Sequence, residues 1–415
     1  MGSSLRVGFL LGLRQIQRAN IWTTSLIIFI MMLTFLNLVG VSGILVGLIE
    51  GSVKANREQY TGNVLMTTPK GDSYIEQSNQ IIQTLKFIPE VSNFTARYLD
   101  TGTIEANYQN RRDPEALRDT VGAQIVGFDP VKEEAVTNLS KYVKEGEYLN
   151  KGEDQYVLIG ANMIQRYVSN FGEGFDTLDD IFPGTKIKIT AGEKTKEYIV
   201  KGIIDSKVDE TSFRVFMTEG EFVRFFERNN LNVNEIAVVA SPDVSENKLK
   251  DILLKSGFGE NAKVQTSEEA IPQFLTDIKI AFSLLGNIIG FIGIIVASIT
   301  IFIIIFINAI TRRKYIGILK AIGIQARSIQ FAYIFQSIFY ALSGATLGVI
   351  IVYAVLVPAF NANPIDFPFS DGILVAPVND VIFKFILLMI VTLLAGFIPA
   401  WTIIRKNTLD SILGR

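Results

Sequence analysis

The side chains that most often carry out chemistry are missing from this sequence. The chain has 415 residues and contains neither cysteine nor histidine. Thiolate and imidazole are the usual protein ligands of transition metals, and they are needed for Ser-His-Asp and Cys-His catalysis. We therefore predict no disulfide, no metal site, no bound cofactor and no catalytic triad.

Paired carboxylates are the remaining candidates for acid–base chemistry. They occur as Asp179-Asp180 and Glu133-Glu134, both in polar stretches. Nothing in the adjacent sequence indicates an apolar pocket that would raise the pKa of a carboxyl group. We interpret both pairs as solvated surface and predict no catalytic residue. The Walker A pattern, G-x-x-x-x-G-K-[ST], does not occur in the printed sequence, so no P-loop is visible.

The segment best suited to recognition follows a long apolar run. Residues 280–311 carry no charge, and a helix needs only about 20 residues to cross a bilayer. Arg312-Arg313-Lys314 end the run, and the positive-inside rule assigns such a cluster to the cytoplasmic side. Residues 315–323 then read YIGILKAIG, which is too apolar for a solvated loop and too short to span.

We expect residues 312–329 to form a short helix at the cytoplasmic membrane surface, with apolar side chains left over for a partner. The alternative is a helix folded back on its own bundle without a partner. Ile318 and Ile322 share a face because they lie four residues apart. The proposed contact residues are Lys314, Tyr315, Ile318, Leu319, Lys320 and Ile322.

These residues carry a family resemblance. The stretch RRKYIGILKAIG (residues 312–323), together with the later Ile329, Phe335, Gln336, Gly344 and Gly348, resembles the signature of the MacB/LolC/FtsX superfamily of ABC-transporter permeases. Tyr315 stands where that family commonly has glutamate. Residues 127–130, 146–149 and 157–160 resemble its G-x-D-P, G-x-x-L and V-L-I-G motifs, and residues 399–413 resemble its closing segment without the proline.

The resemblance implies partners rather than cofactors. It implies a separate cytoplasmic ABC ATPase subunit and a second permease subunit, either identical or different. It also implies contact with membrane lipids and admits a periplasmic adaptor or accessory protein. The ATPase would dock on residues 312–329, which act as a coupling helix.

Composition and charge support a membrane protein with a large polar insert. Hydrophobic residues make up 49% of the chain, and the mean hydropathy is +0.33. The predicted cytoplasmic segments hold eleven basic residues and one acid, Asp410, whereas the remainder is acidic. This asymmetry predicts a multi-pass protein of the cell membrane with both termini in the cytoplasm. An acidic remainder also argues against nucleic-acid binding.

The expected fold class is four transmembrane α-helices plus a large α+β extracytoplasmic domain between the first and second. The predicted order is an amphipathic cytoplasmic helix (5–20), the first span (21–49), the extracytoplasmic domain with its stalks (50–279), the second span (280–311), the coupling helix (312–329), the third span (330–357), an outer loop (358–380), the fourth span (381–404) and a cytoplasmic tail (405–415). On the amphipathic helix, Leu5, Phe9, Leu13 and Ile16 fall on one arc.

The extracytoplasmic domain is predicted to have two parts. Two β-α-β segments, over residues 63–97 and 235–266, are typical of a ferredoxin-like sheet, and a mainly β subdomain is inserted at about residues 121–231. We expect stalk helices over residues 50–60 and 267–279. The second would start at a Thr266–Glu269 capping box and kink slightly at Pro272.

Glycines in two spans predict close helix packing. They are Gly40, Gly43 and Gly47 in the first span and Gly344 and Gly348 in the third. Small residues let helices approach closely in a membrane, here either within the chain or against a second permease subunit.

The leading functional hypothesis is the permease subunit of an ATP-driven transporter that exports or extracts a hydrophobic or lipidated substrate. Its extracytoplasmic domain would move when a partner hydrolyses ATP. The alternative is an FtsX-like regulator that transmits motion to an envelope hydrolase. The size of the extracytoplasmic domain favours the first. A tethered adhesion module is the third hypothesis, and it gives no reason for an apolar cytoplasmic helix.

Overall fold

The computed structural model describes residues 2–109, 118–168, 176–367, 370–372 and 374–404. The chain divides into two compact units. The helical unit contains Met1–Ile49, Asp277–Asp366 and Asp371–Arg415, and the α+β unit contains Glu50–Thr276 and Phe367–Ser370. The predicted cytoplasmic tail, residues 405–415, lies outside the described residues.

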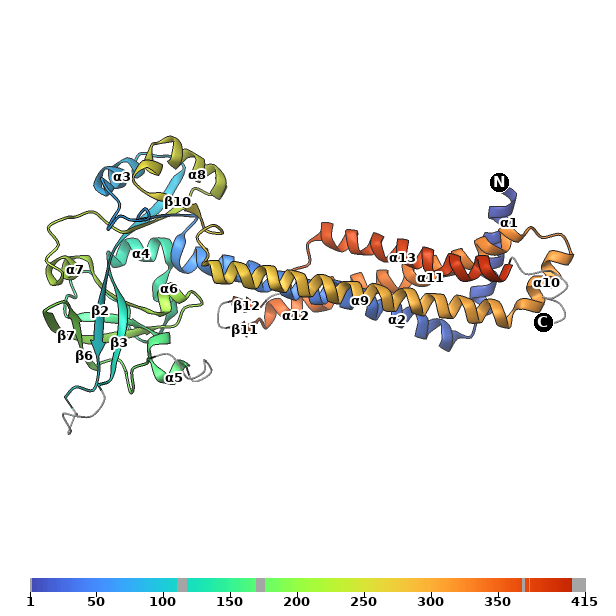
Figure 1. Ribbon diagram of the computed structural model, residues 1–415, viewed down its shortest axis with the longest axis horizontal. Helices are drawn as coiled ribbons and strands as arrows, with labels where there is room; N and C mark the ends of the chain where they lie inside the picture. Colours follow the sequence, from blue (N-terminus) through green and yellow to red (C-terminus); the bar gives the residue numbers. More distant parts are fainter. Residues whose placement is uncertain (1, 110–117, 169–175, 368–369, 373, 405–415) are drawn as a thin grey trace. The chain divides into compact units, whose positions relative to one another are not determined.

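Four long apolar helices form most of the helical unit (Figure 1). They are α2 (Ile21–Asn56), α9 (Gln273–Thr311), α11 (Ala326–Ile351) and α13 (Val378–Ile404). Each is long and apolar enough to cross a membrane. A π turn (Val352–Leu356) and α12 (Val357–Ala362) extend α11, and a short hairpin of β11 (Ile365–Phe367) and β12 (Ser370–Gly372) follows. The four spans of the predicted fold class are confirmed.

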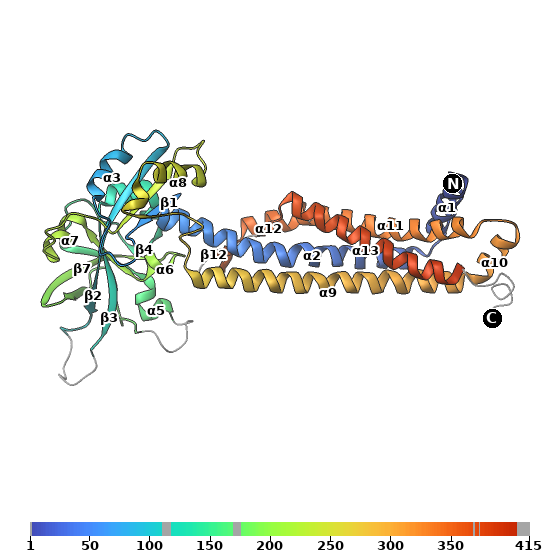
Figure 2. The same ribbon diagram turned by 45° about the horizontal axis from the view of Figure 1, so that its top comes forward.

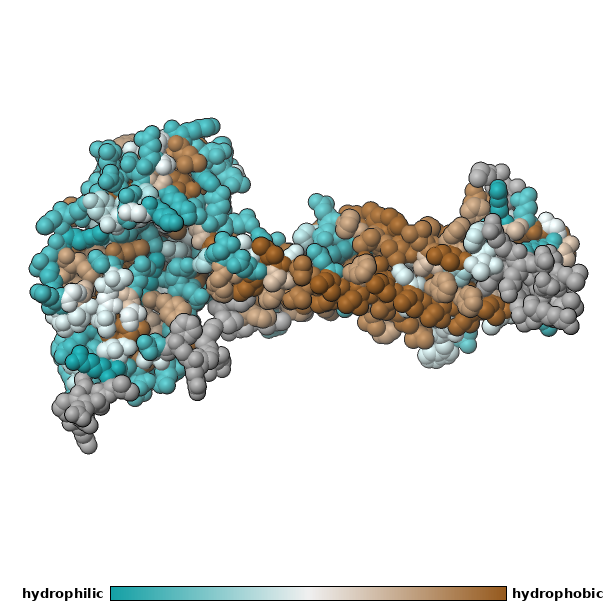
Figure 3. Space-filling model, viewed as in Figure 1, coloured by the Kyte–Doolittle hydropathy of each residue, from teal (hydrophilic) through white to brown (hydrophobic). Residues whose placement is uncertain are grey.

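The outward surface of these helices is apolar. Figure 3 shows hydrophobic residues along the visible face of α9, where Leu284 is 60% exposed and Phe291 is 64% exposed. Exposing so continuous an apolar surface to water is unfavourable. This surface therefore suits contact with lipid or with another apolar surface, as expected for a multi-pass membrane protein.

The N-terminal helix α1 (Gly2–Gln17) packs against α11. An added Cβ at Gly8 would lie 2.7 Å from Phe331 Cβ, and one at Gly12 would lie 3.0 Å from the Ala332 carbonyl oxygen. The backbones therefore approach closely at these glycines. Phe9, on the predicted apolar arc, is 48% exposed. Its ring nevertheless lies 4.6 Å from the ring of Phe335 on α11. Part of the apolar arc therefore packs on the protein beside the glycines.

The α+β unit is built on one ten-stranded sheet. At one end, two β-α-β segments interlock: β1 (Val64–Thr67), α3 (Ser78–Leu85) and β2 (Val91–Glu105), then β9 (Glu235–Ala240), α8 (Glu246–Lys255) and β10 (Lys263–Thr266). Their strands are ordered β10-β1-β9-β2, and every neighbouring pair is antiparallel. This is the strand order of a ferredoxin-like sheet, as predicted.

Apolar side chains on α3 and α8 form part of the core of this end of the sheet. Ile81 and Leu85 of α3 and Leu249 and Leu253 of α8 are buried in the largest core cluster. In each helix the buried pair lies four residues apart, the spacing of one helical face. Helix α3 begins at Ser78 and ends at Leu85, so it has only about two turns.

The inserted part continues the same sheet rather than forming a separate one. Strand β2 extends past Arg97 to Glu105 and pairs with β3 and β6, an extension that the sequence did not predict. The inserted strands are β3 (Thr120–Phe128), β4 (Val143–Gly146), β5 (Tyr156–Gly160), β6 (Lys186–Ala191), β7 (Lys194–Ile204) and β8 (Arg214–Thr218). Its short helices are α4 (Pro130–Thr137), α5 (Gln165–Val168), α6 (Asp209–Ser212) and α7 (Glu219–Phe225). Figure 2 shows the elongated strands β2 and β3 side by side.

Two local predictions need correction. The Thr266–Glu269 capping box forms, with Thr266 N donating to Glu269 Oε2 (3.0 Å) and Glu269 N donating to Thr266 Oγ1 (3.3 Å). It closes only a turn, however, because α9 begins at Gln273, directly after Pro272. Proline lacks the N–H that a helix interior needs, so the helix starts after it instead of kinking through it.

Glu133 is the second correction. From the sequence we predicted that its side chain is solvated. In the structure Glu133 lies on α4, is 2% exposed and pairs with Arg97. Its neighbour Glu134 accepts hydrogen bonds from the hydroxyl and the backbone N–H of Ser140. The partner of Glu133 comes from a distant strand, so the local sequence could not reveal the burial.

Candidate functional site

The segment between the second and third spans forms the short helix α10 (Arg313–Ala321). Arg312 leaves the helical region at φ −99°, ψ 10°, which separates α10 from α9. Gly323, at φ +92°, ends it. Ile324 N donates to the Leu319 carbonyl and Gly323 N to the Lys320 carbonyl, both at 3.0 Å. This is a Schellman ending, which favours glycine because of the positive φ.

One face of α10 packs against the helical unit. Ile316 is 3% exposed and belongs to the buried cluster of the bundle. Leu319 and Ile324 pack against that cluster and are partly buried. These contacts fix the rotation of α10 about its own axis.

The opposite face is also apolar and is exposed. Tyr315 is 69% exposed, Ile318 is 52% exposed and Ile322 is 70% exposed. Their spacing of three and four residues places them in one stripe. A solvated helix normally turns charged residues outward, so the second apolar face of this short helix is available for contact with lipid or with another molecule. We call Tyr315, Ile318 and Ile322 the outward stripe.

Basic residues border the outward stripe. Lys314 is exposed and Lys320 is half-buried. Partial burial lowers the pKa of Lys320. Residues 312–327 carry five basic residues and no acid. A partner would therefore need an apolar groove with acidic side chains at its rim.

Five of the six predicted contact residues thus lie in the outward stripe of α10 or beside it. Leu319 is the exception, because it turns toward the bundle. The stripe begins in the residue that replaces the family glutamate, Tyr315. An aromatic ring there adds apolar area where an acid would add charge.

The predicted packing glycines pack mainly within the chain. An added Cβ at Gly344 would lie 2.4 Å from Met31 Cβ, and one at Gly348 would lie 2.5 Å from Phe35 Cδ1, both on α2. At Gly43 it would lie 2.7 Å from the Val375 carbonyl oxygen. Gly47 is buried, whereas a Cβ at Gly40 would meet nothing within 4 Å.

Comparison with known proteins places α10 inside a matched region. Residues 287–408 match the family described as FtsX-like permease C-terminal. The predicted resemblance to MacB/FtsX-type ABC transporter permeases is confirmed. Because α10 and the third and fourth spans all lie within the match, the outward stripe is part of the permease domain.

Two relatives agree with this assignment. The macrolide export ATP-binding/permease protein MacB of Haemophilus ducreyi is 32% identical over 124 residues, which are 29% of this chain and 18% of that protein. An uncharacterized ABC transporter permease of Methanocaldococcus jannaschii is 25% identical over 288 residues, 66% of this chain and 65% of that protein. The chain thus spans less than two thirds of the length of either relative.

Two solved structures are similar to this chain over about half of its length. The periplasmic region of MacB from Actinobacillus actinomycetemcomitans has 16% identity and a TM-score of 0.35, covering 51% of this chain and 92% of that one. The extracellular domain of the ABC-type transporter YknZ from Gram-positive bacteria has 15% identity and a TM-score of 0.32, covering 49% of this chain and 99% of that one.

Proposed function

We propose that this permease is the membrane subunit of an ATP-driven ABC transporter, and that a separate ATPase subunit binds the outward stripe of α10. The observation that carries the proposal is the exposed apolar face of Tyr315, Ile318 and Ile322 on a helix whose other face is already packed. Fully burying an aliphatic side chain is worth about 1.5–3 kcal/mol. Three half- to two-thirds-exposed side chains therefore suit a specific contact.

The proposed orientation places α10 and both termini in the cytoplasm. It is supported by the basic residues at the end of α1 and over residues 312–327, and by the acidic balance of the α+β unit. In this orientation the α+β unit is extracytoplasmic. ATP binding and hydrolysis by the partner would move the spans, and that motion would pass along α2 and α9 to this unit.

The proposed substrate class is hydrophobic or lipidated. No ionisable side chain lies near the middle of a span, which argues against ion-coupled transport. The relative from Haemophilus ducreyi is named for macrolide export, and macrolides are largely apolar molecules. The FtsX-like alternative, regulation of an envelope hydrolase, predicts the same contact at α10 but a different output.

Purification from native membranes tests the proposal. The tagged permease, extracted in mild detergent, should retain an ABC ATPase subunit that mass spectrometry identifies, and the complex should hydrolyse ATP. Retention of an envelope hydrolase in place of any transported lipid or drug would favour the regulatory alternative. Recovery of the permease without any ATPase, under conditions that preserve another ABC complex, would contradict both.

A further inference from the structure

The last turn of α2 has an unusual geometry where it joins the α+β unit. Residues Arg57–Thr61 form a π turn, and Gly62, at φ +63°, ends it. Single π turns widen a helix locally and occur frequently at functional positions. Here Gln59, Tyr60 and Thr61 are all less than a tenth exposed. In a regular α-helix three successive residues spread over about 200°, so the wider turn helps to bury all three.

Tyr60 enters a buried cluster of charged side chains. Its hydroxyl donates to Glu235 Oε1 (2.7 Å) and accepts from Arg214 Nη2 (3.3 Å). Arg97 Nη2 donates to the Tyr60 carbonyl oxygen (2.7 Å). The guanidinium carbons of Arg97 and Arg214 lie 5.1 and 4.9 Å from the centre of the Tyr60 ring, within cation–π range. The ring, the hydroxyl and the backbone of Tyr60 are therefore all held.

The charges of this cluster compensate one another. Arg97 contacts Glu133 (Nη2–Oε1, 2.6 Å) and Glu235 (Nη1–Oε2, 3.2 Å), and Arg214 contacts Glu235 (Nη2–Oε1, 2.8 Å). No member is more than 5% exposed. Removing one partner would leave an uncompensated buried charge, which is strongly unfavourable. The four charged side chains therefore hold one another in place, and moving any one of them is unfavourable.

Glu235 stays charged at physiological pH. Burial alone would raise the pKa of Glu235, but the guanidinium groups of Arg214 and Arg97 lower it to about 2. The stabilisation is thus fully present above the ordinary glutamate pKa of about 4.3, and it is lost as the pH falls toward about 2. Burial likewise raises the pKa of the Tyr60 hydroxyl, so Tyr60 remains a donor.

Members of the cluster come from both parts of the sheet. Glu235 begins β9 of the ferredoxin-like part, and Arg97 lies on β2, which both parts share. Arg214 begins β8 and Glu133 lies on α4, both in the inserted part. One tyrosine at the end of α2 is therefore connected to both parts of the α+β unit.

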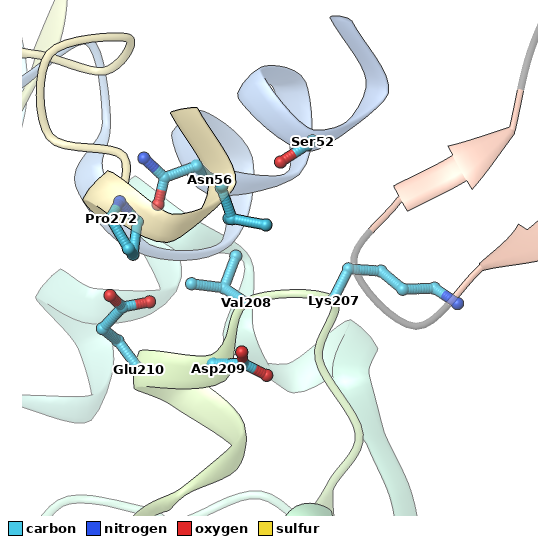
Figure 4. A pocket seen from close by; sticks show the side chains of 8 residues that line it. Ser52, Asn56, Lys207, Val208, Asp209, Glu210 and Pro272 are labelled. Carbon is cyan, nitrogen blue, oxygen red and sulfur yellow. The ribbon is translucent and has the colours of Figure 1, made fainter. Parts of the chain in front are cut away.

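The connection that returns to α9 is built differently. Residues 267–272 form turns with no regular helix or strand. Asn56 Nδ2 donates to the Ser267 carbonyl oxygen (3.0 Å). Figure 4 shows a pocket beside this connection, with Pro272 on one wall and Asn56, Val208 and Glu210 around it. Ser267 is itself buried, and its Oγ donates to Glu246 Oε2 (2.7 Å). Beyond Ser267 the turn is exposed at Glu268 and Glu269, and the ion pair of Glu269 with Lys250 is open to solvent. An exposed turn is less constrained than one enclosed by buried ion pairs.

We propose that Tyr60, Arg97, Glu133, Arg214 and Glu235 form the joint that fixes the end of α2 to both parts of the α+β unit, and that the return connection at residues 268–272 is the compliant one. We call the five residues the Tyr60 joint. The inference rests on the proposed function, in which motion of the spans is passed to this unit. A displacement of α2 would then reach β2, β8 and β9 together, while the start of α9 adjusts.

Hydrogen–deuterium exchange of the full-length chain in detergent tests the joint without any partner. In the wild-type protein, amides of residues 57–62 should exchange at least about tenfold more slowly than those of residues 268–271. Tyr60→Phe keeps the ring but removes both hydroxyl contacts, and it should accelerate exchange at residues 57–62 about tenfold. The matched control is Tyr198→Phe, because Tyr198 is 1% exposed and also donates to a glutamate, Glu221 (2.8 Å).

The outcomes separate the joint from the proposed function. Unchanged exchange at residues 57–62 in Tyr60→Phe, or equal acceleration there in Tyr198→Phe, would overturn the joint. Tyr60→Phe could unfold the whole α+β unit. In that case the two segments are compared in the wild-type protein. Exchange at residues 57–62 that is as fast as or faster than exchange at residues 268–271 would overturn the joint. Failure to recover an ATPase would contradict the proposed function and leave these exchange results unaffected.

Discussion

At the scale of single residues, the rotation of α10 decides which side chains are available to a partner. Its apolar residues point almost all the way round the helix, so the sequence alone cannot say which of them the bundle buries. Ile316 and Leu319 face the bundle, which leaves Tyr315, Ile318 and Ile322 outside. Ile318 is the central member of the outward stripe, so it offers the sharpest test.

We expect Ile318→Asp to abolish co-purification of the ATPase while the permease still inserts and folds. The change removes apolar contact area and places a charge where it would be desolvated, at a combined cost of several kcal/mol. Gln325→Asp is the matched control, because it adds the same charge at an exposed position that precedes α11. Affinity purification and gel filtration report the bound ATPase. Normal ATPase stoichiometry in Ile318→Asp would mean that the contact lies elsewhere.

Two glycines in the spans give a matched pair for packing. We expect Gly344→Ala to destabilise the helical unit by roughly 1–3 kcal/mol, because its Cβ would lie 2.4 Å from Met31 Cβ. Gly40→Ala should be neutral or slightly stabilising, since nothing lies within 4 Å of its Cβ and alanine favours helix. Thermal unfolding in detergent measures both. Equal midpoints would show that α2 and α11 do not pack this closely.

At the scale of elements, patterns that extend over many residues of the sequence were sufficient to predict most of the fold. Uncharged apolar runs predicted the four spans, and β-α-β patterns predicted the ferredoxin-like part. Elements whose formation depends on distant partners were missed. Strand β4 has only four residues and pairs with β7, and the extension of β2 to Glu105 depends on pairing with β3 and β6.

The candidate sites were predictable to different degrees. The short apolar helix α10 was visible because its composition conflicts with a loop. The Tyr60 joint was not, because Arg214 and Glu235 begin their strands, where charged residues are usually solvated, and the predicted first β-α-β segment ended at Arg97. Only the antiparallel pairing of β2 with β9 and the parallel pairing of β3 with β8 bring them together.

Stiffness of the connecting helix can be tested directly. We expect two glycines inserted after Val53 of α2 to leave ATPase binding intact but to abolish ATP-dependent changes in hydrogen exchange within the α+β unit. Each glycine costs a helix interior about 1 kcal/mol and allows local bending. The control is the same insertion after Lys151, in an exposed turn of the α+β unit. Unchanged ATP-dependent exchange with the α2 insertion would exclude transmission through this helix.

At the scale of the whole molecule, the charge asymmetry makes a prediction about orientation. The natural chain has no cysteine, so single cysteines can be introduced without background. We expect Lys141→Cys to react with a membrane-impermeant maleimide applied from outside and Gln325→Cys to react only after permeabilisation. Both positions are exposed, so a missing reaction cannot be due to burial. Labelling of Gln325→Cys in intact cells would reverse the proposed topology.

The central claim is that an ATPase subunit sits on the outward stripe of α10. Site-specific photo-crosslinking in native membranes tests it most directly, with a benzophenone amino acid at position 318 and, as control, at position 325. We expect position 318 to crosslink to an ATP-binding subunit and position 325 to give little or none of this product. A crosslink from position 318 only to the permease itself, in membranes where the ATPase is present, would contradict the claim.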